Sequence, residues 1–162
     1  MNIRNSKPNG FTLLELLIVI GVIILFVVIG VILLGTARER ERDAKRLSDI
    51  DTIRHSLDEY FYNNNRYPQA PTPVMLGSQG YRTICAGTAT GFADSRADCG
   101  NATVYLEAIP QPPEPQPSQQ VGYVYTSPNP NTSYTIDAAL EGALNGVQGK
   151  VQITPAGMQL KQ

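Results

Sequence analysis

The sequence predicts an α+β protein in which one long N-terminal helix packs on a small C-terminal antiparallel sheet. Three observations predict this class. An apolar run extends from Phe11 to Gly35, the following stretch to Asn63 has no Gly or Pro, and apolar residues alternate in the last third. The 162 residues, 42% hydrophobic with a net charge of −1, suffice for a membrane segment and one modest domain. This charge gives no general attraction for nucleic acid, so no nucleic-acid partner is predicted.

The apolar run contains a single charged residue, Glu15. The run exceeds the roughly 20 residues that a membrane-spanning helix needs. It is also longer than the 7–15 or so apolar residues of a secretory signal, so signal-peptidase cleavage near Gly35-Thr36-Ala37 is not expected. A carboxylate inside such a segment costs on the order of 3 kcal/mol, so Glu15 is a functional-site hypothesis that needs a cationic partner.

The residues that precede Glu15 form an ordered motif. A short basic leader ends in Lys-Pro-Asn-Gly10 and is followed by Phe11-Thr-Leu-Leu-Glu15. This string resembles the class III leader of type IV prepilins and type II secretion pseudopilins. The resemblance implies that prepilin peptidase cuts between Gly10 and Phe11 and that Phe11 becomes N-methylated. It also implies that Glu15 neutralises the α-amino group of a neighbouring subunit during assembly.

The same resemblance implies a domain organisation and a function. Residues 1–10 would be the cleaved leader, 11–36 the transmembrane and filament-core half-helix, 37–64 the amphipathic half-helix, and 65–162 an extracytoplasmic pilin-like head. The implied function is a structural subunit of a type IV pilus or a related pseudopilus. Its partners would be membrane lipid before assembly, the assembly platform and motor, and other copies in a helical filament.

The second half of the helix is expected to be amphipathic. It carries an apolar stripe at helical spacing, and an asparagine triplet at 63–65 and Pro68 are expected to end it. The stripe must pack against the rest of the chain. Its members are Leu47, Ile50, Ile53, Leu57, Tyr60 and Phe61.

A basic block at 38–46 conflicts with this orientation. Its five cations outnumber Arg4 and Lys7 before the apolar run, and the positive-inside rule taken by itself would place the C-terminal part in the cytoplasm. The leader motif predicts the opposite. The block is either a solvated helix face held by local ion pairs, which we favour, or a site for intersubunit pairing or anionic headgroups.

The remaining chain is predicted to be loops followed by strands. Residues 68–108 are expected to be loop-rich with a short strand at 104–109, and the Pro-rich stretch 110–117 to be a stiff solvated spacer. Strands are expected at 121–127, 134–140 and around Val151 and Ile153.

Cys85 and Cys99 lie in a polar, Gly- and Ala-rich stretch. In an exported domain this pair suits a disulfide, which would stabilise the fold by about 3 kcal/mol. Two free thiols in a cytosolic domain are the alternative.

No catalytic, metal or cofactor site is predicted, and the protein is not expected to be an enzyme. His55, the only histidine, falls opposite the apolar stripe, and Asp94 and Asp98 lack a calcium-ligand pattern. The main alternative is an uncleaved single-span membrane protein with an extracytoplasmic binding domain. A membrane-tethered enzyme lacks a recognisable catalytic set, and the sequence does not choose between pilin and pseudopilin.

Overall fold

One helix, α1, spans Leu13–Asn64 in the computed structural model of the chain. The structure describes residues 11–117, 122–142 and 149–160, so the predicted leader 1–10 lies outside the described residues. The chain divides into two units, Met1–Arg38 and Glu39–Gln162. The second unit is called the head.

The C-terminus of α1 confirms the predicted stop. Asn65 has a φ of 52°, and its backbone N–H donates to the carbonyl of Phe61 at 2.8 Å. Asparagine tolerates this left-handed conformation better than most residues, so it can end a helix in the way that glycine usually does.

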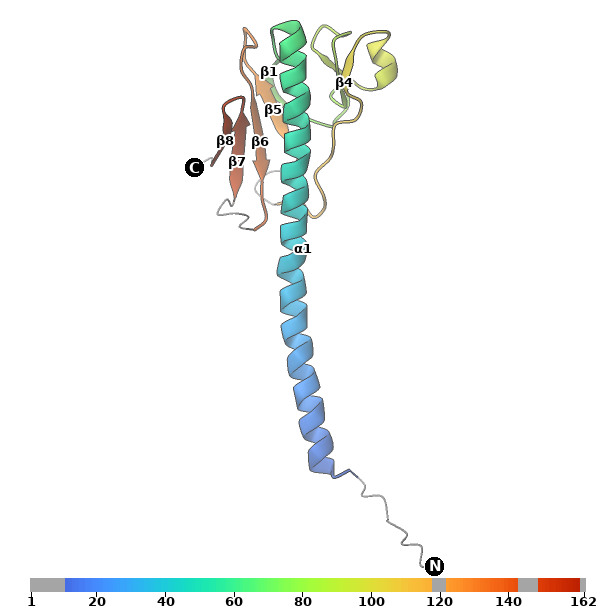
Figure 1. Cartoon of the computed structure of the whole chain (residues 1–162), viewed down its shortest axis with the longest axis vertical. Coiled ribbons are helices and arrows are strands. Elements are labelled where there is room, and N and C mark those ends of the chain that lie inside the picture. Colours follow the sequence, from blue (N-terminus) through green and yellow to red (C-terminus); the bar gives the residue numbers. More distant parts are fainter. Residues whose placement is uncertain (1–10, 118–121, 143–148, 161–162) are drawn as a thin grey trace, which may run out of the picture. The chain divides into compact units, whose positions relative to one another are not determined.

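A five-stranded antiparallel sheet forms the larger part of the head, in the order β1-β5-β6-β7-β8 (Figure 1). Neighbouring strands bring apolar residues opposite one another, as Ile136 faces Ile153 and Val151 faces Leu160. The strands are β1 (Ala70–Met75), β5 (Val124–Ser127), β6 (Thr135–Ala139), β7 (Lys150–Thr154) and β8 (Gly157–Leu160).

The predicted apolar stripe of α1 is confirmed as the side of the helix that enters the core. Ile50, Ile53, Leu57 and Tyr60 are almost fully buried, while Leu47 and Phe61 are partly buried at its border. Burying each of these side chains stabilises the fold by roughly 1.5–3 kcal/mol. Their core includes Tyr123, Tyr125, Tyr134, Ile136, Val151 and Ile153 from the sheet.

A smaller three-stranded sheet, with the order β3-β2-β4, packs beside the large sheet, because the Phe92 ring of β3 meets the Tyr125 ring of β5 edge-on with centroids 5.3 Å apart. In Figure 1, β4 lies to the right of α1 and β6 to β8 lie to its left. The Tyr105 ring on β4 meets Tyr60 of α1 edge-on, with centroids 5.2 Å apart. Gly91 is required here, because a Cβ at its position would lie 2.7 Å from the Tyr60 hydroxyl. The elements are β2 (Thr83–Cys85), β3 (Phe92–Ala93), the 3₁₀ helix η1 (Arg96–Cys99) and β4 (Val104–Leu106).

The segment 68–108 is loop-rich, as expected, and the strand predicted at 104–109 is present as β4 (Val104–Leu106). The segment also contains β1, β2 and β3, which were not predicted because they are short or carry proline and so lack a clear alternating pattern. One expectation needs correction. The stretch 110–117 is not a freely solvated spacer. The Arg46 guanidinium donates to the carbonyls of Pro113 and Pro115 at 3.0 and 2.8 Å, which ties this stretch to α1.

Candidate assembly site

Thr12 caps the N-terminus of α1. The backbone N–H of Glu15 donates to Thr12 Oγ1 at 3.2 Å, and the N–H of Leu16 donates to the Thr12 carbonyl. The pattern Thr-x-x-Glu before an apolar run is a capping-box signature. Thr12 therefore holds the first turn of α1 through the backbone of Glu15, a role that was not predicted although the Thr-x-x-Glu spacing is visible in the sequence.

Glu15 lies in the first turn of α1, where the exposed N–H groups and the helix dipole favour a negative charge. Its side chain is exposed, and so is that of Phe11, at 79%. Among the described residues no cation lies within ion-pair distance of Glu15. Gly10, the other predicted site residue, falls outside the described part of the chain.

The apolar side chains that follow Glu15 are exposed along the helix. The large apolar residues from Leu16 to Val31 have exposed fractions of 45–69%. Apart from the neighbouring backbone of α1, no atom of the described residues lies within 4 Å of a Cβ placed at Gly21. By length and composition, this part of α1 can cross a membrane. So much apolar surface in a single chain requires a cover, either lipid or the helices of other copies.

In the head, Arg42 and Glu141 form a close ion pair in which the guanidinium donates through both Nε and Nη2. Glu141 follows β6, so this pair ties the sheet to α1. The hydrogen bond from Arg42 lowers the pKa of the Glu141 carboxyl below its usual range, and the same bond raises the pKa of the Arg42 guanidinium.

Arg46 and Asp43 form the centre of the same ionic network and are each only 1% exposed. Arg46 binds Asp43 at 2.8 Å and Glu141 at 2.6 Å. Asp43 also accepts the backbone N–H groups of Glu141 and Gly142 at 3.0 and 2.8 Å. A buried charge is tolerated when it is paired and hydrogen-bonded in this way.

The basic block is therefore not simply a solvated face. Besides Arg42 and Arg46, Lys45 also has an acid partner within the head, Asp49, at 2.5 Å. Asp49 is itself buried and accepts the hydroxyl of Tyr123 at 3.1 Å. Three of the five cations are thus neutralised inside the head, which leaves little of the block free to attract anionic headgroups.

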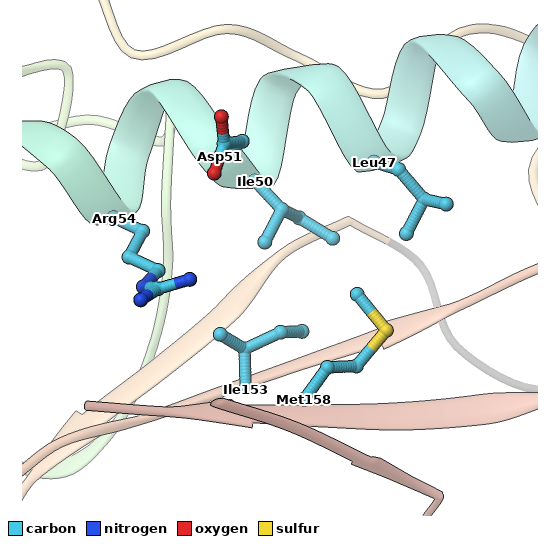
Figure 2. Close-up of a pocket in the computed structure, with 6 residues that line it drawn as sticks. All are labelled: Leu47, Ile50, Asp51, Arg54, Ile153 and Met158. Atoms are coloured by element: carbon cyan, nitrogen blue, oxygen red, sulfur yellow. The ribbon is translucent and has the colours of Figure 1, made fainter. Parts of the chain in front are cut away.

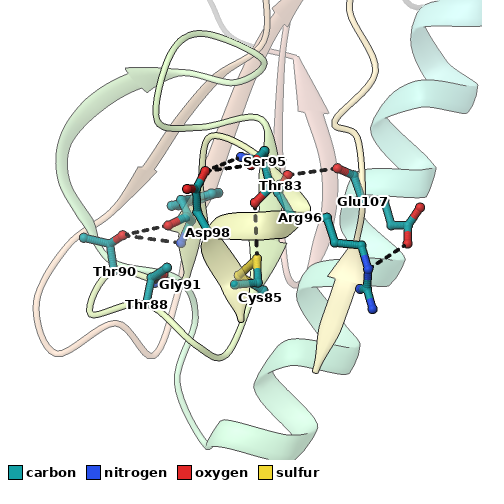
Figure 3. Close-up of a disulfide and its surroundings, with 11 residues drawn as sticks. Thr83, Cys85, Thr88, Thr90, Gly91, Ser95, Arg96, Asp98 and Glu107 are labelled. Carbon is teal, nitrogen blue, oxygen red and sulfur yellow. Dashed lines mark hydrogen bonds and ion pairs between the residues drawn. A yellow bond between two sulfur atoms is a disulfide. The ribbon is translucent and has the colours of Figure 1, made fainter. Parts of the chain in front are cut away.

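Cys85 and Cys99 form the predicted disulfide, with Cα atoms 6.1 Å apart (Figure 3). Both residues are buried, and they join β2 to the end of η1. Asp98 accepts hydrogen bonds from the backbone N–H and the hydroxyl of Ser95, so it fixes the first turn of η1 (Figure 3).

The other candidate residues have local roles. His55 is 80% exposed and lies 3.5 Å from Asp51, which agrees with its predicted place on the surface. Asp94 accepts the N–H of Gly80 and lies near Arg82. Among the described residues no group of three His, Cys, Asp or Glu side chains could hold a metal ion.

A shallow depression lies between α1 and the β7–β8 edge, lined by six residues (Figure 2). Its volume of about 90 Å³ is far below the roughly 300 Å³ at which small-molecule sites begin. Its residues are Leu47, Ile50, Asp51, Arg54, Ile153 and Met158.

Comparison with known proteins identifies the family. The chain is 30% identical over 119 residues to the type II secretion system core protein G of Aeromonas hydrophila, covering 73% of this chain and 76% of that protein. The chain belongs to the type II secretion pseudopilin family. A second pseudopilin relative, core protein G of Pectobacterium carotovorum subsp. carotovorum, is 42% identical over 65 residues, 38% of this chain and 40% of that protein. No family model and no solved structure matches the chain.

Membership confirms the predicted resemblance and the pilin-like fold class. Pseudopilins are structural proteins, and the chain is not an enzyme. The apolar helix fits a protein anchored in a membrane.

Proposed function

We propose that this chain is a structural subunit of a type II secretion pseudopilus or a closely related type IV pilus. Prepilin peptidase removes residues 1–10, and Phe11 becomes the N-methylated end. Residues 11–36 then hold the subunit in the inner membrane, with the amphipathic half-helix 37–64 and the globular part 65–162 on the extracytoplasmic side. The assembly platform and its motor draw the subunit into a helical filament.

The observation that carries this proposal is the position of Glu15. It is an acid in the first turn of an exposed apolar helix, without a cation within reach among the described residues. Cutting after Gly10 would create an α-amino group on Phe11, about one helical turn from Glu15 along the chain. A neighbouring copy can supply the same amine, and this would compensate the carboxylate where the surroundings are apolar.

The names of the relatives support the secretion assignment. Both are core proteins of type II secretion systems, and the likeness to the first covers most of both chains. In a protein whose helix only anchors a binding domain, a carboxylate at position 15 would make insertion of the helix less favourable and would serve no function.

Mass spectrometry of the N-terminus tests the proposal most directly. Protein purified from its native membranes should begin at a methylated Phe11. A Gly10→Val variant should keep the full precursor mass, while a Pro8→Ala variant, altered two residues before Gly10, should still be processed. An intact residue 1 on wild-type protein, from cells with active peptidase, would favour an uncleaved single-span protein with a binding domain.

Deletion of the gene separates pseudopilus from pilus. Loss of a secreted enzyme from the medium with surface fibres unchanged indicates a pseudopilus. Loss of surface fibres with secretion unchanged indicates a type IV pilus.

A further inference from the structure

The disulfide between Cys85 and Cys99 is enclosed by the small sheet of the head. Cys85 lies on β2, the central strand of the order β3-β2-β4, and its exposed fraction is 0%. Cys99 ends η1 and is 3% exposed. Ala93 of β3 is buried together with both cysteines, and Val104 of β4 packs against them. Both neighbours of β2 therefore take part in the enclosure.

Backbone hydrogen bonds hold this enclosure together. The N–H of Cys85 donates to the carbonyl of Gly91 at 3.1 Å, and the N–H of Ala86 donates to the carbonyl of Thr103 at 3.0 Å. Because the sulfur atoms belong to residues that are almost fully buried, a reagent in solvent reaches them only when the small sheet opens locally.

The loop that the disulfide closes is also part of the main core of the head. Phe92 of this loop is 3% exposed, and its ring meets the Tyr125 ring of β5 edge-on. Gly91 beside it lies so close to α1 that a Cβ there would be 2.7 Å from the Tyr60 hydroxyl. Opening this loop to expose the sulfur atoms would therefore disturb contacts with α1 and with the large sheet.

Forming the bond requires access to these sulfur atoms. One cysteine thiolate of the chain attacks a sulfur of the oxidant's disulfide and releases one oxidant thiolate, which leaves a mixed disulfide. The second cysteine thiolate attacks the chain sulfur of that mixed disulfide and releases the other oxidant thiolate. The chain loses two electrons and two protons, and the oxidant becomes a dithiol. The oxidant must therefore touch a sulfur atom that the folded head encloses.

We infer that a disulfide-bearing oxidant oxidises Cys85 and Cys99 before the head folds. The reaction that must supply the folded head is thiol–disulfide exchange on the open chain, in the extracytoplasmic compartment where disulfides form and persist. Once the small sheet has closed, the same enclosure keeps reductants away from the bond. This inference rests on the proposed extracytoplasmic position of the head, and it adds a chemical step between membrane insertion and filament entry.

Oxidised glutathione tests the order of the two steps. The full chain in detergent is reduced and unfolded in urea, then refolded without oxidant, and tyrosine fluorescence shows whether the reduced head folds. The thiols of the refolded chain should be oxidised at least about tenfold more slowly than those of the unfolded chain, because the reaction waits for local opening. A reduced head that does not fold supports the same order, since the bond is then needed first. A folded, reduced head whose oxidation is slowed by less than about tenfold would overturn it.

An exposed thiol in the same loop is the matched control. Ala89 is exposed, so Ala89→Cys in a chain that also carries Cys85→Ser and Cys99→Ser has its one thiol outside the enclosure. This thiol should react with oxidised glutathione at similar rates in the folded and the unfolded chain. The control separates the burial of the native sulfur atoms from the effect of urea on the reaction.

A pulse-chase experiment tests the same order in cells. Dithiothreitol added before the pulse should leave both thiols free, whereas dithiothreitol added after the chase should leave the bond intact. The thiols are counted by alkylation after an acid quench. Loss of the bond in both arms would overturn the inference.

The N-terminus of the chain is measured on the same samples. If the chain begins at Phe11 and the bond is lost in both arms, the order is wrong while the proposed function stands. If untreated cells contain a chain with an intact leader and two free thiols, the order and the proposed function are both wrong.

Discussion

Two carboxylates on the same helix are held in opposite ways. Asp43, in the head, is 1% exposed and is compensated within the chain by Arg46 and by two backbone N–H groups. Glu15, in the apolar segment, has Thr12 and the helix N-terminus beside it but no cation among the described residues. The charge of Asp43 is thus compensated when the head folds, whereas Glu15 in an apolar environment needs a charge from outside the fold.

The apolar side chains show the same contrast. In the head, Ile53, Leu57 and Ile136 are fully buried by the sheet and the helix, as in a soluble domain. In the segment before it, Leu17, Ile24 and Phe26 are more than half exposed. One unit is stabilised by its own packing, and the other depends on lipid or on neighbouring helices.

The largest effect is expected from removing the charge of Glu15. Glu15→Ala and Glu15→Gln should both be inserted and cleaved normally but should lower filament yield by about tenfold or more, since each removes the carboxylate of the proposed pair with the Phe11 amine. Filaments sheared from cells and quantified against membrane precursor measure this.

Glutamine distinguishes the two roles of Glu15. It can serve in a capping box but carries no charge. Thr12→Ala, which removes the cap while keeping the carboxylate, should therefore have a much smaller effect. Wild-type yield from Glu15→Gln would show that Glu15 acts as a helix cap only.

The second largest effect is expected on the stability of the head, where the buried carboxylate of Asp43 is compensated within the chain. Arg46→Ala leaves Asp43 buried without its cation and releases the carbonyls of Pro113 and Pro115, so it should destabilise the head by about 3–5 kcal/mol. Urea unfolding followed by tyrosine fluorescence reports on the head, because all eight tyrosines lie at or beyond Tyr60. Arg54→Ala, at a partly exposed pair, should cost less than about 1 kcal/mol.

The sequence predicted the helix and its apolar stripe well because both depend on local patterns. The apolar run and the asparagine stop at 63–65 placed its ends within two residues of Leu13 and Asn64. The disulfide pairing and four strands, β4, β5, β6 and β7, were also predicted. The strand β1 was missed because Pro71 and Pro73 argue against a strand, although an edge strand tolerates them.

The ionic network was missed for a different reason. Asp43 and Glu141 are 98 residues apart, and a sequence pattern does not place them together. The sequence does hold a signal for their burial. Asp43 and Arg46 lie seven residues before Ile50 and Ile53, so the helical period puts them on the same, buried face of α1. The network was not predicted because charged residues on this helix were expected to face solvent.

The third prediction concerns the disulfide, a covalent tie that has no counterpart in the apolar segment. Replacing both cysteines by serine should destabilise the head by about 3 kcal/mol, since Cys85 and Cys99 close a loop with a sequence separation of 14. The same urea titration should show it, and reduction of the wild-type protein should give a similar shift. An unchanged midpoint would mean that the two small-sheet strands hold this loop without the bond.

The smallest effect is a pH dependence of the head that depends on Glu141. Arg42 lowers the pKa of this carboxyl in the folded state, while in the unfolded chain it returns to its ordinary value near 4.5. The stabilisation is therefore fully present above about pH 4.5 and is lost as the pH falls through the lower folded pKa. Glu141→Gln should be less stable than wild type at pH 7, and the difference should shrink below pH 4.5.

The other charged groups of this network, Asp43, Arg42 and Arg46, are present in both proteins, so subtracting the two stability curves isolates Glu141. A difference that stays constant down to pH 2 would show that Glu141 contributes by hydrogen bonding and shape, and that the head does not depend on its charge.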